Sequence, residues 1–252
     1  MFRSDDLPPV NFHWALVWEN RWALVRGLEV SIQVSIVALV TSVAIGLFLA
    51  ISRMSSFKPA SMFAASYVNI FRGIPALVSV IWVYFGWSLL FGYNFTVFQA
   101  GVIALTLLYS AFFSEIFRAA LQAIPKGQRE AGLALGMSRA RVFTSLILPQ
   151  ATKIAIPNIG SMYIGMVKDT STFAIIGLVE VVRVTQNLNA TNFQPFVLYS
   201  AAAVLYVCIA FAVDLIFRGI EKNFQYPPTG RISRFLTKGK NQKVAVLIAK
   251  FS

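Results

Sequence analysis

Few side chains in this sequence are of the types that carry out catalytic or metal-binding chemistry. The 252 residues include one histidine, His13, and one cysteine, Cys208. A single cysteine cannot form an intrachain disulfide, and the pair is too small a ligand set for a metal site. His13 has no credible catalytic partners, so we expect no hydrolase centre and no metal site.

Nucleotide hydrolysis by the chain itself is excluded by the absence of a phosphate-binding loop. Such a loop needs Gly-x-x-x-x-Gly-Lys-Ser/Thr, whose backbone N–H groups and lysine hold the phosphates. Gly127 and Gly132 have the glycine spacing, but Leu133-Ala134 follow where Lys-Ser/Thr is required. We therefore expect no cofactor in this chain, and any ATP and Mg²⁺ that drive its function belong to another subunit.

A polar, basic interval, Glu130–Pro149, lies between long apolar runs. Pro125 suits a first helical turn, and Lys126–Leu135 contains good helix formers. Gly136 is the residue type that ends a helix in the left-handed conformation, and Ser138 can cap a second helix. We predict two short helices with a sharp turn between them. Apolar contacts around the turn are expected from Leu133, Leu135, Met137, Val142 and Phe143, while Arg129, Arg139 and Arg141 face water or a partner.

The same pattern of helix, turn and helix with basic residues also describes a DNA-binding helix-turn-helix. The flanking sequence argues against that alternative, because a soluble DNA reader would not place its reading head between membrane-length segments. We expect no nucleic acid partner.

Composition indicates an all-α membrane protein. Hydrophobic residues make up 57% of the chain, charged residues 13%, and the mean hydropathy is +0.68. A chain of this length holds about five spans of about 20 residues. The first residues lack the pattern of a cleaved signal peptide, so the first span is expected to direct insertion. The predicted spans are Leu28–Ser52, residues 60–91 with a kink or restart at Pro75, Val97–Leu121, Gln150–Val167 and Phe196–Phe217.

Two segments are predicted to be irregular or interfacial. The fourth span, Gln150–Val167, holds Pro157 and Gly160 and is expected to be short and interrupted, as where a transport pathway lies. After it we expect a half-buried helix at Phe173–Val182 and an outer loop at Arg183–Pro195. Near the N-terminus, Trp14, Trp18 and Trp22 recur every four residues, which favours an approach along the membrane surface, with ligand stacking as the alternative.

The basic residues predict the orientation. They cluster after the first, third and fifth predicted spans, whereas the loop after the second has none. Positive residues favour the cytoplasmic side, which places the N-terminus outside and the C-terminus inside. Arg3, Arg21 and Arg26 argue mildly the other way. The interval Glu130–Pro149 then lies in the cytoplasm.

Four ordered elements resemble the membrane (permease) subunits of binding-protein-dependent ABC importers, specifically the polar amino acid permease family. They are Phe71-Arg72-Gly73-Ile74-Pro75; Ser114-Glu115-Ile116-Phe117-Arg118-Ala119; Glu130-Ala131 with Gly136 and Leu148-Pro149; and Lys168-Asp169-Thr170-Ser171. Ser114, Ala119 and Gly132 depart from the family pattern. Gly132 stands where alanine is usual, which lowers local helix stability by roughly 1 kcal/mol.

This resemblance implies a coupling helix that docks on a separate ATPase subunit. Its expected contact residues are Glu130, Ala131, Gly132, Leu135, Gly136, Arg139 and Pro149, and other family-motif residues are Phe71, Arg72, Gly73, Pro75, Arg118 and Lys168. It also implies a second permease subunit, identical or a sister chain, an extracytoplasmic solute-binding protein, and alternating access in the bacterial inner membrane. The family domain is expected at 27–226, between an interfacial segment at 1–26 and a basic cytoplasmic tail at 227–252.

Several alternatives stay open. Ser110, Glu115, Met162 and Asp169 are candidates for contact with a zwitterionic or cationic substrate, yet a structural pair of Glu115 with Arg118 at i,i+3 explains that carboxylate equally. Arg72 could contact lipid phosphate or another subunit. The tail could bind anionic lipid or be solvated. A secondary transporter and a purely structural membrane protein are the competing classes. The sequence does not name the amino acid carried.

Overall fold

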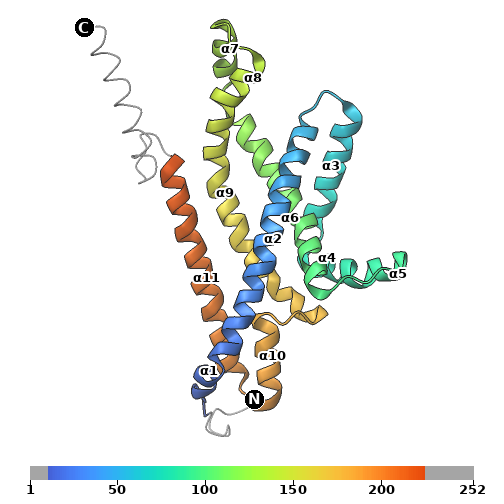
Figure 1. The fold of residues 1–252 in the computed structure, drawn as a ribbon, viewed down its shortest axis with the longest axis vertical. Helices are drawn as coiled ribbons and strands as arrows, with labels where there is room; N and C mark the ends of the chain where they lie inside the picture. Colours follow the sequence, from blue (N-terminus) through green and yellow to red (C-terminus); the bar gives the residue numbers. More distant parts are fainter. Residues whose placement is uncertain (1–10, 225–252) are drawn as a thin grey trace, which may run out of the picture. The chain divides into compact units, whose positions relative to one another are not determined.

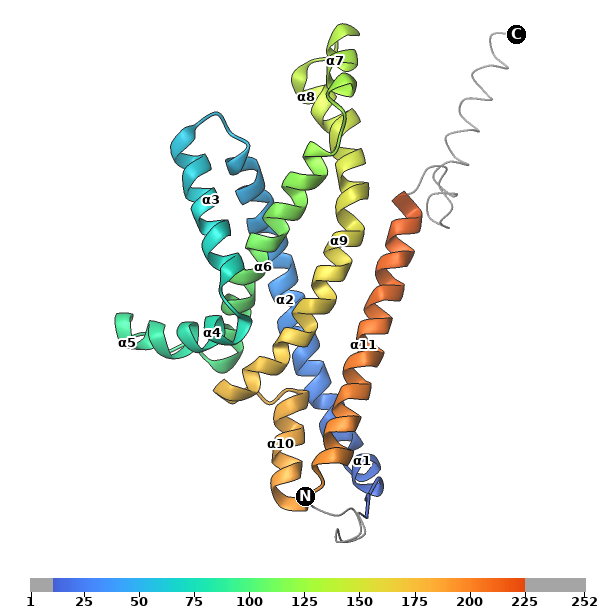
Figure 2. The ribbon, with the colours of Figure 1, turned by 180° about the vertical axis from the view of Figure 1, so that it is seen from behind.

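The computed structural model describes residues 11–224, which form helices joined by short turns, with no β-strand among them (Figures 1 and 2). The all-α prediction is therefore confirmed. The predicted basic tail at 227–252 and Arg3 lie outside the described residues. The helices are α1 (Ala15–Glu19), α2 (Arg21–Arg53), α3 (Lys58–Gly73), α4 (Ala76–Ile81), α5 (Trp87–Phe91), α6 (Val97–Gln122), α7 (Lys126–Ala134), α8 (Arg139–Val142), α9 (Leu148–Asp169), α10 (Val181–Asn192) and α11 (Pro195–Phe224), with π-helical turns η2 (Trp82–Gly86) and η3 (Phe143–Ile147) and the 3₁₀ helix η4 (Thr170–Ile176).

Helices α2, α6 and α11 are each long and apolar enough to cross a membrane, and they contain the first, third and fifth predicted spans, with α2 starting earlier and α11 ending later than predicted. The second predicted span is the pair formed by α3 and Ala76–Phe91, which bends by 107°. The bend follows from Pro75, whose ψ of 144° is extended and which stands at the N-cap of α4. The fourth predicted span corresponds to α9, which is more polar, so the count of five remains a prediction.

The chain divides into two compact units. Among the described residues, unit 1 comprises 11–42, 70–109 and 165–210, and unit 2 comprises 43–69, 110–164 and 211–224. The boundaries between the units fall inside long helices. Each of α2, α6, α9 and α11 contributes residues to both units.

Close helix packing inside unit 2 depends on glycines, as is usual in membranes. A Cβ on Gly46 of α2 would lie 2.8 Å from the Cβ of Phe113 on α6. A Cβ on Gly160 of α9 would lie 2.7 Å from the ring of Phe217 on α11. Any larger residue would therefore separate these helices.

The expected interruption of the fourth span is wrong. The chain is helical without a break from Arg139 to Asp169, through α8, η3 and α9. Pro149 has no N–H to donate, so the carbonyl four residues earlier loses its usual partner and the preceding turn widens into the π-helical η3. Pro157 lies inside α9, where the Asn158 side chain donates to the Ile154 carbonyl at 2.9 Å and supplies a bond near the gap.

The two elements expected after the fourth span are also corrected. Of the predicted helix at Phe173–Val182, residues 173–176 belong to the 3₁₀ helix η4, a turn follows at Gly177 with φ of +88°, and Val181 already begins α10. The predicted outer loop at Arg183–Pro195 is mostly the helix α10. Sequence reasoning missed α10 because its polar composition resembles a loop and its N-cap is glutamate, a residue outside the usual capping set.

Glu180 fixes the start of α10 within unit 1. Its side chain is fully buried and accepts bonds from the N–H groups of Val182 and Arg183, both at 2.8 Å. The hydroxyl of Tyr206 on α11 donates to the same carboxylate at 2.9 Å. Burial raises the pKa of the Glu180 carboxyl, and these hydrogen bonds act in the opposite direction. The carboxylate thus ties α10 to α11.

We expect Glu180→Ala to destabilise unit 1 by about 2–3 kcal/mol, because it leaves buried donors without an acceptor. Glu29→Ala, which removes an exposed carboxylate from α2, should change stability by less than about 0.5 kcal/mol. Thermal unfolding of the purified protein in detergent, with hydrogen exchange across α10, measures both. Equal unfolding temperatures and equal hydrogen exchange across α10 in the two variants would contradict this role of Glu180.

Candidate functional site

The segment that resembles a coupling helix has the predicted two-helix geometry. Helix α7 ends at Ala134, and Gly136 follows the C-cap residue Leu135 with a φ of +76°. The N–H of Gly136 donates to the Leu133 carbonyl at 2.9 Å, and the N–H of Met137 donates to the Gly132 carbonyl at 3.1 Å. These two bonds form a Schellman C-cap. Ser138 then caps α8 by accepting from the N–H of Arg141, as predicted.

The apolar contacts of this segment differ from the prediction. Val142 is buried, with 1% of its surface exposed. Leu135 is 82% exposed, so it contributes little to the apolar contacts around the turn. Gly132 is buried within the segment, and a Cβ there would lie 2.8 Å from Val142 and 2.9 Å from Leu146. Its departure from the family alanine therefore serves internal packing of α7 against η3, and it offers no surface to a partner.

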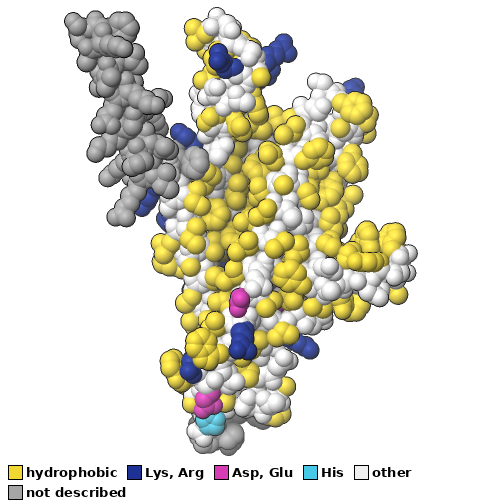
Figure 3. Space-filling model, in the orientation of Figure 1, with side chains coloured by type: hydrophobic (Ala, Val, Ile, Leu, Met, Phe, Trp, Pro, Cys, Tyr) yellow, Lys and Arg dark blue, Asp and Glu magenta, His cyan; other side chains and the backbone are white. Residues whose placement is uncertain are grey.

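Basic side chains lie on the outer surface of the segment beside apolar ones, and Figure 3 shows Lys and Arg side chains over α7 and α8. Glu130 and Ala131 on α7, Arg139 on α8 and Pro149 at the start of α9 are exposed. Together with Leu135, they give the segment a mixed polar and apolar surface that could meet another protein.

A charged cluster lies in unit 2, where α2 ends beside α6. Glu115 binds Arg118, as the i,i+3 spacing predicted, and Arg53 of α2 donates to the other side of the same carboxylate at 2.5 Å. The three side chains are 17–27% exposed. Two guanidinium groups therefore neutralise the Glu115 carboxylate. This favours a structural role for Glu115, joining α2 to α6, over a contact with substrate.

Two of the other substrate-pathway candidates, Asp169 and Ser110, form hydrogen bonds with tyrosines. In unit 1, the Tyr109 hydroxyl donates to the Oδ2 atom of Asp169 at 2.9 Å. In unit 2, the fully buried Ser110 shares a hydrogen bond with the Tyr67 hydroxyl at 2.9 Å. Met162 is partly buried on α9. Ser110, Glu115 and Met162 belong to unit 2, and Asp169 belongs to unit 1.

The remaining family-motif residues lie at helix ends. Phe71, Arg72 and Gly73 form the last turn of α3, and Pro75 begins α4 after the bend. Lys168 is exposed in the last turn of α9. These positions place the motifs at breaks in the helical path.

Sequence reasoning missed Arg53, Tyr67 and Tyr109 as site residues. Arg53 is 62 positions from Glu115, and Tyr109 is 60 positions from Asp169. No short-range pattern connects such pairs, and only the packing of α2, α3 and α9 against α6 brings them together. Within the described part of the chain, no cluster of His, Cys, Asp and Glu could hold a metal ion.

Apolar helices long enough to cross a membrane, with a capped two-helix segment between them, indicate a membrane protein. Residues 42–226 match the family described as "Binding-protein-dependent transport system inner membrane component", and the chain belongs to that family. It is a permease subunit rather than an enzyme, in the inner membrane of bacteria, and membership implies ATPase and binding-protein partners.

Known relatives and a solved structure agree with this family. The glutamine transport system permease protein GlnP of Escherichia coli K12 is 33% identical over 86% of this chain and 99% of its own length. The L-cystine transport system permease protein TcyB of Bacillus subtilis is 33% identical over 89% of this chain and 93% of its own. The crystal structure of an amino acid ABC transporter with histidines is 31% identical, covers 85% of this chain and 100% of its own, and has a TM-score of 0.80.

The left-handed turn can be tested with two glycines that both have open space for a Cβ. Neither Gly127 nor Gly136 has an atom within 4 Å of an added Cβ, so only the positive φ of Gly136 separates them. We expect Gly136→Ala to destabilise the segment by roughly 1–2 kcal/mol, and Gly127→Ala to be neutral or stabilising. Hydrogen exchange at residues 126–142 measures the difference, and equal protection in the two variants would contradict the strain argument.

Proposed function

We propose that this chain is the permease subunit of an ATP-driven importer of polar amino acids. Its relatives are named for glutamine and L-cystine transport, and the solved structure that it resembles is an amino acid ABC transporter. The chain pairs with a second permease subunit, identical or a sister chain, and each receives one ATPase. Substrate arrives from an extracytoplasmic binding protein.

The observation that carries this proposal is the Schellman-capped turn that exposes Leu135 between two short helices. A rigid turn that exposes 82% of Leu135 suits a groove on a partner protein, because a few side chains buried in such a groove contribute most of the binding energy. The unbroken helical stretch from Arg139 to Asp169 gives movement of this turn a stiff route into the spans. The positive-inside rule supports a cytoplasmic place for the segment.

The transport cycle follows from this arrangement. ATP binding in the partner subunits brings the two coupling segments together, and the spans switch from an inward-open to an outward-open state. The N-terminus lies outside and the C-terminus inside, in agreement with the clusters of basic residues.

Among the pathway candidates, Asp169 is the best suited to an ammonium group. Glu115 is neutralised by two arginines, whereas one oxygen of Asp169 is occupied by Tyr109. Asp169 ends α9, where the helix tightens into η4 and the backbone geometry changes. A carboxylate at such a position can bind the side-chain cation of a basic amino acid while Tyr109 holds the orientation of the carboxylate.

Replacing the exposed anchor tests ATPase coupling. We expect Leu135→Glu to lower capture of the co-expressed ATPase by at least tenfold, because a charge enters an apolar contact. Ser145→Glu, which adds the same charge to another exposed position in the segment, should retain the ATPase. In proteoliposomes, uptake should continue when ion gradients collapse and stop without ATP. Uptake that follows an ion gradient without ATP would reject the importer in favour of a secondary transporter.

Asp169→Asn tests the substrate contact. The loss of a charged hydrogen-bond acceptor should reduce uptake of cationic amino acids by about tenfold relative to neutral ones. Tyr109→Phe should produce a smaller change in the same direction, and Glu29→Gln should produce none. Radiolabelled uptake at saturating binding protein measures the ratio. Unchanged selectivity in Asp169→Asn would remove Asp169 from the pathway and leave the ATPase result intact.

A further inference from the structure

A basic pocket of about 510 Å³ opens in unit 2 where α6 gives way to α7. Lys126 and Arg129 of α7 and Arg139 of α8 line it, together with apolar side chains such as Met54, Leu121 and Phe143. No aspartate or glutamate is among its lining residues. The pocket therefore combines positive charge with an apolar floor.

The cations of this basic pocket form no ion pair within the described part of the chain, and the nearby Glu130 on α7 does not line the pocket. Lys126, Arg129 and Arg139 are exposed, and none of them makes an ion pair or hydrogen bond with another residue in 11–224. Lys126 and Arg129 are three residues apart on α7, so they repel each other on one helix face. An anion in the pocket would relieve this repulsion.

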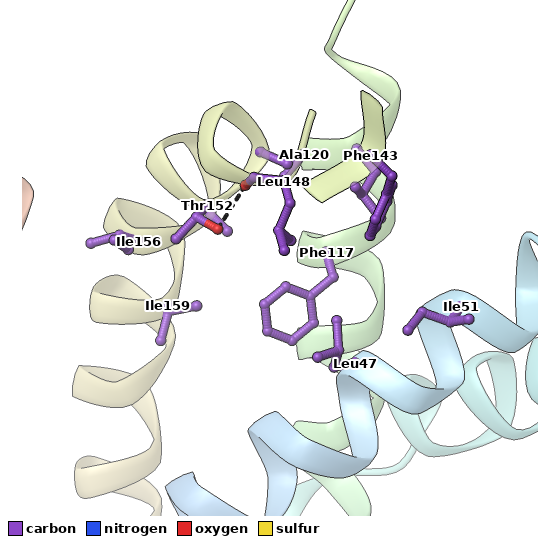
Figure 4. A pocket seen from close by; sticks show the side chains of 12 residues that line it. Leu47, Ile51, Phe117, Ala120, Phe143, Leu148, Thr152, Ile156 and Ile159 are labelled. Carbon is purple, nitrogen blue, oxygen red and sulfur yellow. Dashed lines mark hydrogen bonds between the residues drawn. The ribbon is translucent and has the colours of Figure 1, made fainter. Parts of the chain in front are cut away.

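An apolar pocket of about 240 Å³ adjoins the basic one and shares Leu121 and Phe143 with it. Figure 4 shows side chains of α2, α6 and α9 around it, among them Phe117 and Ile159. Its one hydroxyl, that of Thr152, already donates to the Leu148 carbonyl at 2.8 Å. The apolar pocket thus offers no free hydrogen-bonding side chain and suits a hydrocarbon chain.

The order of the two pockets along the helices matches that of a phospholipid. The span candidates α2 and α6 end at Arg53 and Gln122, and the basic pocket begins at this level with Met54, Leu121 and Gln122. The apolar pocket lies beside the last turns of the same spans, at Leu47, Ile51 and Phe117. Charged headgroups lie where spans end, and acyl chains lie alongside the spans.

We infer that the two pockets together bind one anionic phospholipid at the base of the coupling segment. Lys126 and Arg129 hold the phosphate, and the apolar pocket takes the first part of an acyl chain. Carboxylates of an ATPase would satisfy the cations but would leave the apolar pocket empty, whereas a phospholipid fills both. This assignment extends beyond the proposed function, because the lipid contacts neither the transported amino acid nor Leu135, which lines neither pocket.

The test uses the complete transporter complex, purified and then supplied with phosphatidylglycerol or phosphatidylcholine. Native mass spectrometry measures the bound lipid. Phosphatidylglycerol should be retained in preference, and Lys126→Gln/Arg129→Gln should lower its retention by roughly tenfold or more. Arg141→Gln is the matched control, because Arg141 is exposed on α8 and lines neither pocket. Arg139 is left unchanged, because it is also one of the residues of this chain that we expect to contact the ATPase.

A second variant separates a lipid from a simple anion. Thr152→Phe fills the apolar pocket and leaves the cations in place, so it should also lower phosphatidylglycerol retention. Retention that falls in the double variant but not in Thr152→Phe would indicate a phosphate contact alone and overturn the inference. Loss of the ATPase from the double variant with unchanged lipid would assign the cations to the ATPase and overturn it as well. Both results are independent of the Leu135→Glu test, so failure here leaves the importer function standing.

Discussion

The constraint on which this structure depends is that polar groups inside a hydrocarbon layer must find partners within the protein, because water is absent there. Pairing between helices meets it repeatedly. Thr41 of α2 bonds Thr106 of α6 at 2.7 Å, and at the end of α2 Arg53 binds Glu115 of α6. Tyr109 of α6 bonds Asp169 at the end of α9. Each pair also fixes the register of two helices, so the groups that satisfy the constraint determine the packing within each unit.

Local features of the chain could be predicted from sequence because each depends on a few adjacent residues. Gly136 adopts positive φ, Ser138 caps α8, and Pro75 bends the chain. Long-range partners could not be predicted, because no local sequence pattern connects Glu115 with the guanidinium of Arg53, which is 62 positions away. The helix-breaking tendency of proline does not predict residue 157 correctly, because α9 continues through Pro157 even though its missing N–H removes one backbone bond.

The helix also continues through Pro149, and this continuity has a mechanical consequence. With Pro149 treated as a boundary, the coupling segment and the fourth span are separate elements joined by a loop. In the structure α8, η3 and α9 are continuous, and the π-helical turn before Pro149 is the one irregular place between Arg139 and Leu148. Force applied to α8 is therefore carried by backbone hydrogen bonds rather than by a flexible connection. The backbone hydrogen bonds of a π-helical turn are less favourable than those of an α-helix, so the helix bends most easily there.

The coupling segment meets two environments that differ in chemistry. Leu135 and its neighbours form a rigid apolar tip suited to a protein groove, whereas Lys126 and Arg129 line a pocket whose floor is hydrocarbon-like. Because α7 carries both the cations and the Schellman cap, an anion that neutralises Lys126 and Arg129 also stabilises the helix that presents Leu135. Lipid charge at the base of the segment would then influence how firmly the tip is held for the ATPase. This coupling requires no contact between lipid and ATPase, since one short helix serves both.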